Sequence, residues 1–506
     1  MCRRERMRGR SWALIFSLIL SVIFLGWTLG AAKVYNVKEV KLRLDFSEQV
    51  RMEYWNTFDN GKPGLDDSYS FYSSKARLGA GVSWKYFDAY VQLHYTQFFD
   101  LPDDGMFGTG VLYHKFNNWE AYEAGRRKEA ADSPGYAAIS QAWIAAKVPW
   151  VKGLKVKLGR FAYNSGLEAG AKNPTIKILK KTRISQRLIG TFEWSRVGRS
   201  FDGFQVVYDR PYWNLSLTAV YPTAGGFYLK RDENEVNGYK MRDISIVAAA
   251  LSLKDSFIDG LDAQAFYYYY NDDRGLYKAG KGADPEIHTV GGHVIFTRPL
   301  GPGAFDLLFW GAYQWGTWGA NGRILDHDAY AFAVEGGYKF TSLAFKPWIR
   351  AGYFYGSGDD DPNDGDHETF FMMIPTLRIY ARTPFYNLMN TEYVFGQLIF
   401  KPLKNVVVRT DVTKLWLTED KDGWYLGSGV CRPDVFGYSS KPSGGDDDLA
   451  TMWDISATIK NIFNYAGFKV NLVLYYSHVW GGDVIENNFK KDEDMDFFYT
   501  ELQIKF

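Results

Sequence analysis

Residues 41–54 read KLRLDFSEQVRMEY, a stretch in which polar and apolar side chains alternate. Successive side chains of a β-strand point to opposite faces, so the alternation predicts a strand with one apolar and one charged face. Only Glu48 interrupts the apolar face. In a water-soluble sandwich the apolar face would point inward, whereas in a membrane barrel it faces lipid and the charged face lines the lumen.

Composition favours the membrane barrel. The chain has 506 residues, of which 17% are aromatic, and its mean hydropathy is -0.28. A soluble chain of this length usually divides into several domains, but a barrel grows with its number of strands. Membrane barrels also concentrate aromatic residues at the two membrane interfaces. A bundle of transmembrane helices would need repeated long apolar runs, and the sequence has only one, at 11–29.

The same alternation recurs along the chain. It predicts an all-β fold, a transmembrane antiparallel up-and-down β-barrel of about eighteen strands. The strands are expected at 40–56, 70–85, 87–99, 139–148, 154–163, 199–209, 213–221, 244–254, 261–271, 287–297, 304–316, 327–340, 344–357, 391–401, 405–418, 449–460, 467–480 and 495–506.

The connections between these strands alternate in length. Tight turns such as 149–153 and 402–404 fall on one side, and long loops such as 100–138 and 164–198 fall on the other. Bacterial outer-membrane barrels have short periplasmic turns and long extracellular loops. The segment 188–194 could form a further strand, but an odd total would break the alternation. We therefore expect it within the third outer loop, either at the surface or folded back into the lumen.

The N-terminus carries a targeting segment. Five arginines precede the apolar run at 11–29, and the small residues Gly30, Ala31 and Ala32 follow it. This order predicts a cleaved secretory signal peptide over 1–32, with 33–506 forming a single barrel domain. The alternative is an uncleaved N-terminal anchor.

The C-terminus resembles the closing strand of an outer-membrane barrel. Residues 501–506 alternate to the last position and end on Phe506, which predicts a contact with the barrel-assembly machinery. We expect a location in the cell outer membrane of a Gram-negative bacterium, in contact with outer-membrane lipid and lipopolysaccharide. With 59 Lys and Arg against 58 Asp and Glu, no basic excess suggests a nucleic-acid partner.

The strands with a clear alternation place more basic than acidic side chains toward the lumen. The candidate pore-lining residues from these strands are Arg43, Arg51, Glu53, Arg77, Arg350, Arg409 and Asp411. A basic wall in a narrow pore attracts anions, which predicts an outer-membrane channel for the passive passage of anionic solutes. The alternative is that the inward charges only solvate a wet lumen and pair with one another.

The outer loops are acidic, with runs of Asp at 359–361 and 446–448 and an Asp-Glu-Asp run at 492–494. They are either solvated tips or are bridged to lipopolysaccharide by divalent cations. The segment 359–365 partly resembles a calcium loop but lacks the glycine and the closing glutamate, so we expect no metal or cofactor. The sequence shows no nucleophile elbow and no zinc helix, so no enzyme is predicted; a Ser–His lipid hydrolase assembled across strands is the alternative.

Two stretches go beyond a generic barrel. The first is Leu158-Gly159-Arg160, followed by QRLIGTFEW at 186–194 and RSFDG at 199–203; the second is GSGDDDPNDG at 356–365. Both resemble the bacterial alginate-export family of outer-membrane porins, in matching order from about residue 51 onward.

The resemblance implies an eighteen-stranded barrel with a basic, arginine-lined constriction that passes an anionic uronate polymer. By motif position, it places Arg160, Arg187, Arg199 and Asp202 in the lumen network. Arg160 shares its parity with Leu158, which should face lipid, so a β-bulge at Gly159 is needed to turn Arg160 inward. The candidate functions are export of an anionic, alginate-like polysaccharide or passage of small polar anions. The alternative channel is a general diffusion porin with little selectivity.

Overall fold

The computed structural model describes residues 34–37, 39–231, 235–236, 239–276, 278, 283–320, 322–374, 383–426, 440–465 and 467–506. The expected signal peptide at 1–32 lies outside these residues. Among the helices that the structure describes, none is both long enough and apolar enough to cross a membrane.

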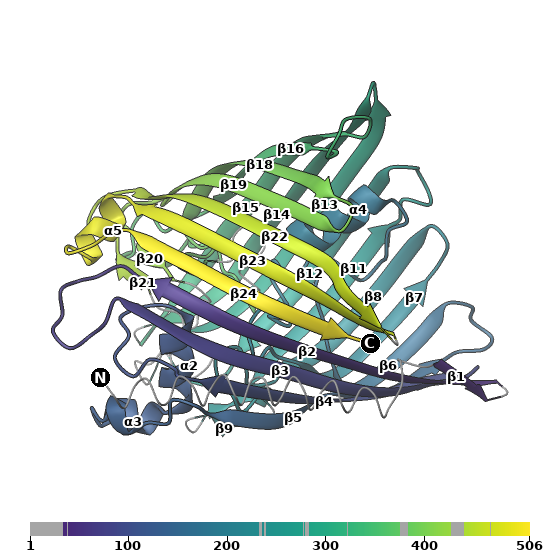
Figure 1. The fold of residues 1–506 in the computed structure, drawn as a ribbon, viewed down its shortest axis with the longest axis horizontal. Helices are drawn as coiled ribbons and strands as arrows, with labels where there is room; N and C mark the ends of the chain where they lie inside the picture. Colours follow the sequence, from purple (N-terminus) through teal and green to yellow (C-terminus); the bar gives the residue numbers. More distant parts are fainter. Residues whose placement is uncertain are drawn as a thin grey trace.

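Within the described residues, the chain forms a closed antiparallel barrel of 18 strands (Figure 1), which confirms the predicted fold class. Each strand pairs with its neighbours along the chain, and β2 pairs with both β3 and β24, which closes the ring. The barrel strands are β2 (Val40–Asn56), β3 (Ser68–Ser83), β4 (Phe87–Phe99), β5 (Gly135–Lys147), β6 (Leu154–Phe161), β7 (Phe201–Asp209), β8 (Trp213–Pro222), β11 (Ile244–Leu253), β12 (Leu261–Asp272), β13 (Asp284–Leu300), β14 (Gly303–Ala320), β15 (Arg323–Phe340), β16 (Trp348–Gly356), β18 (Thr391–Leu403), β19 (Val406–Trp416), β22 (Asp448–Tyr465), β23 (Phe468–Gly481) and β24 (Met495–Lys505).

Short elements decorate the barrel. Two further strands join the main sheet: β1 (Val34–Val37) pairs with the start of β2, and β17 (Asp366–His367) runs parallel to β15. The remaining elements lie in the connections. They are α2 (Thr109–Asn117), α3 (Trp119–Glu123), η1 (Arg127–Glu129), α4 (Pro174–Leu179), η2 (Lys180–Ile184), β9 (Glu235–Val236), β10 (Tyr239–Lys240), η3 (Met241–Asp243), β20 (Gly423–Tyr425), β21 (Ser440–Pro442) and α5 (Asp483–Asn488).

Several expected boundaries were wrong, and two of the differences change the connection between strands. The strands β14 and β15 remain paired as far as Ala320 and Arg323, so a connection expected to be long is a tight outer turn. The strand expected from 344 begins at Trp348, because Phe345 and Lys346 have positive φ angles of 62° and 46° and Pro347 has no N–H to donate to the ladder. Lys346 therefore lies in a periplasmic turn.

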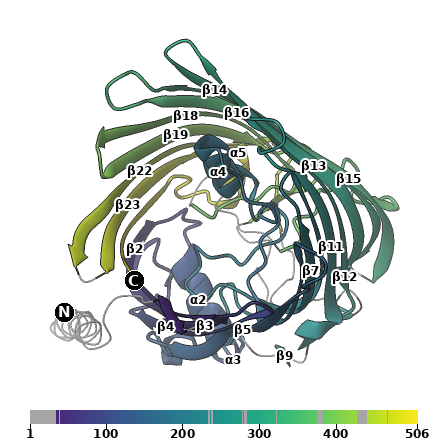
Figure 2. The ribbon, with the colours of Figure 1, turned by 90° about the vertical axis from the view of Figure 1, so that its right-hand side faces the viewer.

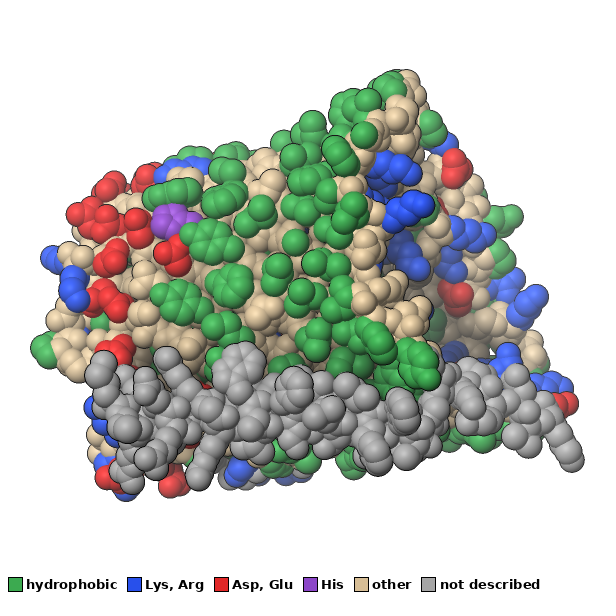
Figure 3. All heavy atoms as spheres, in the orientation of Figure 1, with side chains coloured by type: hydrophobic (Ala, Val, Ile, Leu, Met, Phe, Trp, Pro, Cys, Tyr) green, Lys and Arg blue, Asp and Glu red, His purple; other side chains and the backbone are tan. Residues whose placement is uncertain are grey.

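The two faces of the barrel differ as the alternation predicts. Large apolar side chains, among them Leu42, Leu44 and Leu78, are exposed on the outward face. Figure 3 shows a broad band of apolar side chains across the strands, with acidic side chains gathered at the end that carries α5. The polar interruption Glu48 accepts a hydrogen bond of 2.5 Å from Ser74 of the neighbouring strand, which satisfies one of its oxygens.

We predict that Leu44→Arg reduces assembly far more than Arg43→Leu. Leu44 is 43% exposed on the outward face, where an arginine near the bilayer midplane costs about 2–4 kcal/mol, whereas Arg43 faces the lumen. The folded fraction of each variant in lipid vesicles, followed by urea titration, measures the difference. Equal folded fractions would mean that the two faces are assigned the wrong way round.

Candidate functional site

The connection between β6 and β7, residues 162–200, folds into the lumen and runs through most of its height. We call it the inward loop. The backbone N–H groups of Lys172 and Asn173 donate to the Asp255 carboxylate at 2.8 and 2.5 Å, and Asp255 lies in the short turn between β11 and β12 at the periplasmic end. Figure 2 shows α4, which follows Asn173, inside the ring of strands. The alternative in which this loop folds back into the lumen is thus confirmed.

The start of α4 is locally encoded. The Asn173 side chain accepts hydrogen bonds from the backbone N–H groups of Thr175 and Ile176, and Pro174 occupies the first helical position. Asparagine is a favoured N-cap, and proline is preorganised for the first turn. This cap turns the chain at the deepest point of the inward loop and starts its return.

Buried ion pairs fix the returning segment to one side of the barrel wall. Lys180 lies 2.9 Å from Asp262, and Arg183 lies 2.8 Å from Glu335. Arg350 joins the network by pairing with Glu335 at 2.9 Å and with Asp306 at 3.0 Å. Removing one member of a buried pair leaves an uncompensated charge and costs about 3–5 kcal/mol, so these contacts hold the loop in one place.

A second set of contacts fixes residues 193–196 to the opposite side of the wall. Arg196 pairs with Glu501 of β24 at 2.9 Å, and Arg51 of β2 pairs with the same carboxylate at 2.6 Å. Arg51 also donates to the Trp194 carbonyl at 3.2 Å, and Lys75 donates to the Glu193 carbonyl at 2.7 Å. The inward loop therefore spans the lumen from one wall to the other.

Most of the candidate pore-lining residues are buried within the protein rather than exposed in the lumen. At most 4% of each is exposed, so the expectation that they line an open path is corrected. The covered residues are Arg51, Glu53, Arg187, Arg199, Arg350 and Asp411. They brace the inward loop and its surroundings: Arg187 stacks on the Trp310 ring at 4.5 Å, and Glu53 accepts a hydrogen bond of 2.7 Å from Thr109 of α2.

Arg160 and Asp202 lie on the outward face, which corrects their expected place in the lumen. Gly159 has a φ of +117°, yet β6 pairs with β5 and β7 without a register shift, so the bulge that would turn Arg160 inward does not form. Arg160 lies opposite Asp202, on the same face as Leu158, which is 53% exposed. The two charges form a bidentate pair with both N–O distances at 2.7 Å.

Three candidate residues keep part of their charge accessible. The side-chain exposure is 64% for Arg43, 17% for Arg77 and 27% for Arg409. Lys147 and Lys155, which share the Asp88 carboxylate at 2.7 Å each, are also partly exposed. Lys155 was missed although Leu154 and Val156 alternate with it and place it toward the lumen.

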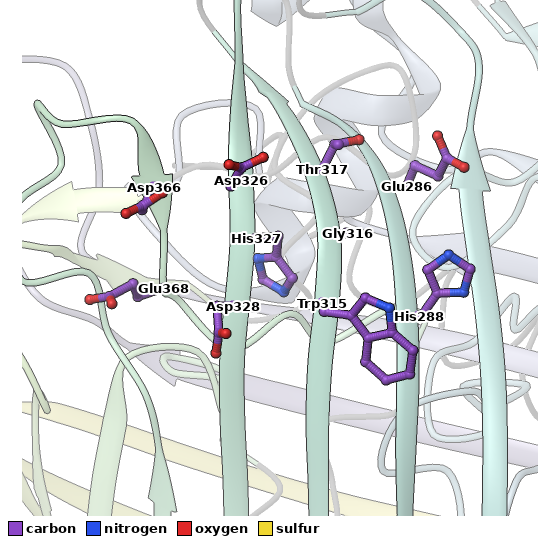
Figure 4. A pocket seen from close by; sticks show the side chains of 10 residues that line it. All are labelled: Glu286, His288, Trp315, Gly316, Thr317, Asp326, His327, Asp328, Asp366 and Glu368. Carbon is purple, nitrogen blue, oxygen red and sulfur yellow. The ribbon is translucent and has the colours of Figure 1, made fainter.

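The outer rim holds an acidic cluster. Carboxylate oxygens of Asp359, Asp360 and Glu368 lie within 4.8 Å of one another, a spacing that could hold a divalent cation. Burial, followed by repulsion from Asp422, raises the pKa of Asp359 to about 7. A second acidic surface lies nearby on the outward side of β13–β15, a hollow of about 670 Å³ whose lining includes Glu286, His288, Trp315, Asp326 and Asp328 (Figure 4). Neither surface lies in the lumen.

The closed barrel, the short periplasmic turns and the inward loop define a channel-forming protein of the outer-membrane class. A sequence profile described as alginate export matches residues 40–497, so the chain belongs to the alginate-export family. No curated protein sequence matches it.

Several solved structures have the same fold. Acinetobacter baumannii OccAB1 has a TM-score of 0.54 at 12% identity, covering 94% of this chain and 98% of that one. Pseudomonas aeruginosa OccK2 (OpdF) has a TM-score of 0.54 at 11% identity, covering 92% and 97%. A second structure of OccK2, in complex with glucuronate, has a TM-score of 0.52 at 10% identity, covering 92% and 97%.

We predict that Arg183→Ala loosens the inward loop and raises the single-channel conductance. The variant leaves Glu335 without its loop partner and should cost about 3–5 kcal/mol of folding stability. Planar-bilayer recording measures the conductance and its fluctuations. The matched control is Lys181→Ala, an exposed cation two residues away in η2. An unchanged conductance in Arg183→Ala would contradict a constriction set by this loop.

Proposed function

We propose that this protein is a passive channel in the outer membrane of a Gram-negative bacterium, and that it passes anionic sugars, including an alginate-like polysaccharide. The observation that carries the proposal is the excess of accessible basic side chains on the lumen wall formed by β2 to β6. One acidic group there, Asp88, is shared by Lys147 and Lys155, and Asp45 pairs with Arg43. The pairs leave a net positive wall, to which Lys157 adds by donating to the neutral Gln205 amide, whereas Arg77 is balanced by Glu193 at 2.7 Å.

Fixed charge acts strongly in such a passage. The surrounding barrel wall and lipid have a low dielectric constant, so field lines are focused along the water-filled path. A net positive wall raises the local concentration of anions and lowers that of cations. The acidic outer rim bears the opposite charge and would favour cations. The preference for anions must therefore come from the basic groups of the lumen.

A second candidate is a porin for small polar anions. The observation that favours it is the inward loop, which occupies much of the lumen and is held by buried ion pairs on both sides. A polymer would have to thread past this loop. The glucuronate bound to OccK2, a protein of the same fold, is a single uronate and suits either candidate. Both candidates share the preference for anions, and they differ in the length of solute that passes.

The proposed partners follow from the outward face. Its apolar band suits the lipid of the outer membrane and the acyl chains of lipopolysaccharide. The Phe506 ring stacks on Phe46 with centroids 5.5 Å apart and lies 4.9 Å from Phe468, so it closes the seam between the first and last strands. We assign to Phe506 the contact with the barrel-assembly machinery.

We predict an anion-selective channel whose selectivity falls in the double variant Arg43→Ser, Lys155→Ser. Both side chains are partly exposed in the lumen, so their loss removes two charges that passing ions meet. The reversal potential in a salt gradient across a planar bilayer should shift toward the cation value. High salt should weaken the effect, because the Debye length falls to about 3 Å at 1 M.

The control removes the same charge outside the lumen, in Lys62→Ser, Lys490→Ser, two exposed lysines of outer loops. It should retain the anion preference. A wild-type channel with cation selectivity, or a double variant indistinguishable from the control, would contradict the proposed function. A wild type that conducts anions but excludes every oligouronate longer than one sugar would favour the second candidate.

A further inference from the structure

We propose that Tyr90 and Trp143, flanked by Arg43 and Lys157, form a binding patch for one uronate unit on the lumen wall. We call these four residues the aromatic–cation patch. The inference rests on the proposed function and deepens it by naming where an anionic sugar is held during passage. Its chemistry requires a ligand with an apolar ring face and a carboxylate, which a uronate supplies in a single unit.

The strand register brings the patch together. Tyr90 of β4 and Trp143 of β5 are directly paired, and Gly81 of β3 links Tyr90 to Arg43 of β2. These residues therefore form one transverse row across four adjacent strands. The Tyr90 and Trp143 rings lie 5.9 Å apart between centroids with an angle of 39° between their planes. They form one continuous aromatic surface on the lumen side of the wall.

Two glycines let the Tyr90 ring lie flat on the wall. A Cβ atom at Gly79 would lie 2.2 Å from the Tyr90 hydroxyl oxygen, and one at Gly81 would lie 3.1 Å from a ring carbon. The ring thus covers the backbone of β3, with its opposite side toward the lumen. Its hydroxyl donates to Asp45 at 2.9 Å and accepts from Gln92 at 2.9 Å, which fixes the ring in this orientation.

Cations surround the aromatic surface. The Arg43 guanidinium lies 5.9 Å from the Tyr90 centroid, and the Lys157 ammonium lies 5.3 Å from the Trp143 centroid. Lys155 adds a third positive group at 5.8 Å from the same ring. A carboxylate above the rings would meet these groups in charge-assisted hydrogen bonds, which are shorter and stronger than neutral ones.

Aromatic residues in membrane barrels usually face the lipid interfaces, where their amphipathic rings match the headgroup region. Tyr90 and Trp143 face the lumen instead and are only partly buried. Neither small inorganic anions nor a purely solvating wall would need a flat apolar surface between the cations. A pyranose ring presents its C–H groups to such a surface while its hydroxyls reach polar neighbours, here the amides of Gln92 and Gln141, which already bond to the two aromatic side chains.

The test measures how long a short oligouronate and a neutral oligosaccharide of equal length interrupt the single-channel current of the full-length protein. Trp143→Ala should shorten the residence time of both sugars about two- to tenfold, the range expected for loss of one aromatic contact. Lys157→Ser should shorten the residence of the oligouronate alone. Trp143→Phe, which keeps a ring, should fall between wild type and Trp143→Ala and remains informative if the alanine variant folds poorly.

The matched control is Trp480→Ala, a tryptophan that is 43% exposed on the outward face of β23, and it should leave both residence times unchanged. Equal residence times in wild type, Trp143→Ala and Trp143→Phe would overturn the patch, while anion selectivity measured separately would leave the proposed function standing. Loss of oligouronate binding in Trp143→Ala with neutral-sugar binding unchanged would also overturn it, because stacking on the ring would not be used.

Discussion

The structure depends on one constraint: a peptide group in the hydrocarbon region of a bilayer must find its hydrogen-bond partner within the protein. Strands satisfy it only when the sheet has no free edge, and here β2 closes the ring by pairing with β24. Closure then fixes the faces. Each strand sends alternate side chains to lipid and to the lumen, so the charged half of every strand is gathered into one enclosed space.

Gathering charge in that space has two consequences: the buried charges must be paired, and the accessible charges act on passing solutes. Buried charges are tolerated only when they are paired, and the inward loop supplies partners: Arg183 meets Glu335, and Arg196 meets Glu501. Many basic side chains of the lumen wall are therefore buried in ion pairs that hold the inward loop. What remains accessible, around Arg43 and Lys155, is the part that a passing solute meets. Stability and selectivity thus use different members of one set of lumen charges.

The sequence predicts the strands well because alternation is a local property of neighbouring residues. For the same reason the sequence predicts that Arg350 faces the lumen. It does not predict that a loop 150 or more positions earlier in the chain covers Arg350, because burial depends on long-range packing. Arg160 shows the opposite case: parity alone placed it outward, and the motif resemblance placed it inward. The strand register places Arg160 on the outward face, as the parity of the strand predicts. The Tyr90–Trp143 pair was missed because only the register across strands brings the two rings together.

The central claim is that accessible lumen cations make this barrel a passive channel for anionic sugars. The most direct measurement is the efflux of a labelled oligouronate, and of a neutral oligosaccharide of equal length, from lipid vesicles that contain the purified protein. The account predicts that both leave without an energy source and that the oligouronate leaves faster at low salt, with the difference shrinking as salt rises. Faster efflux of the neutral sugar, or retention of both, would contradict it.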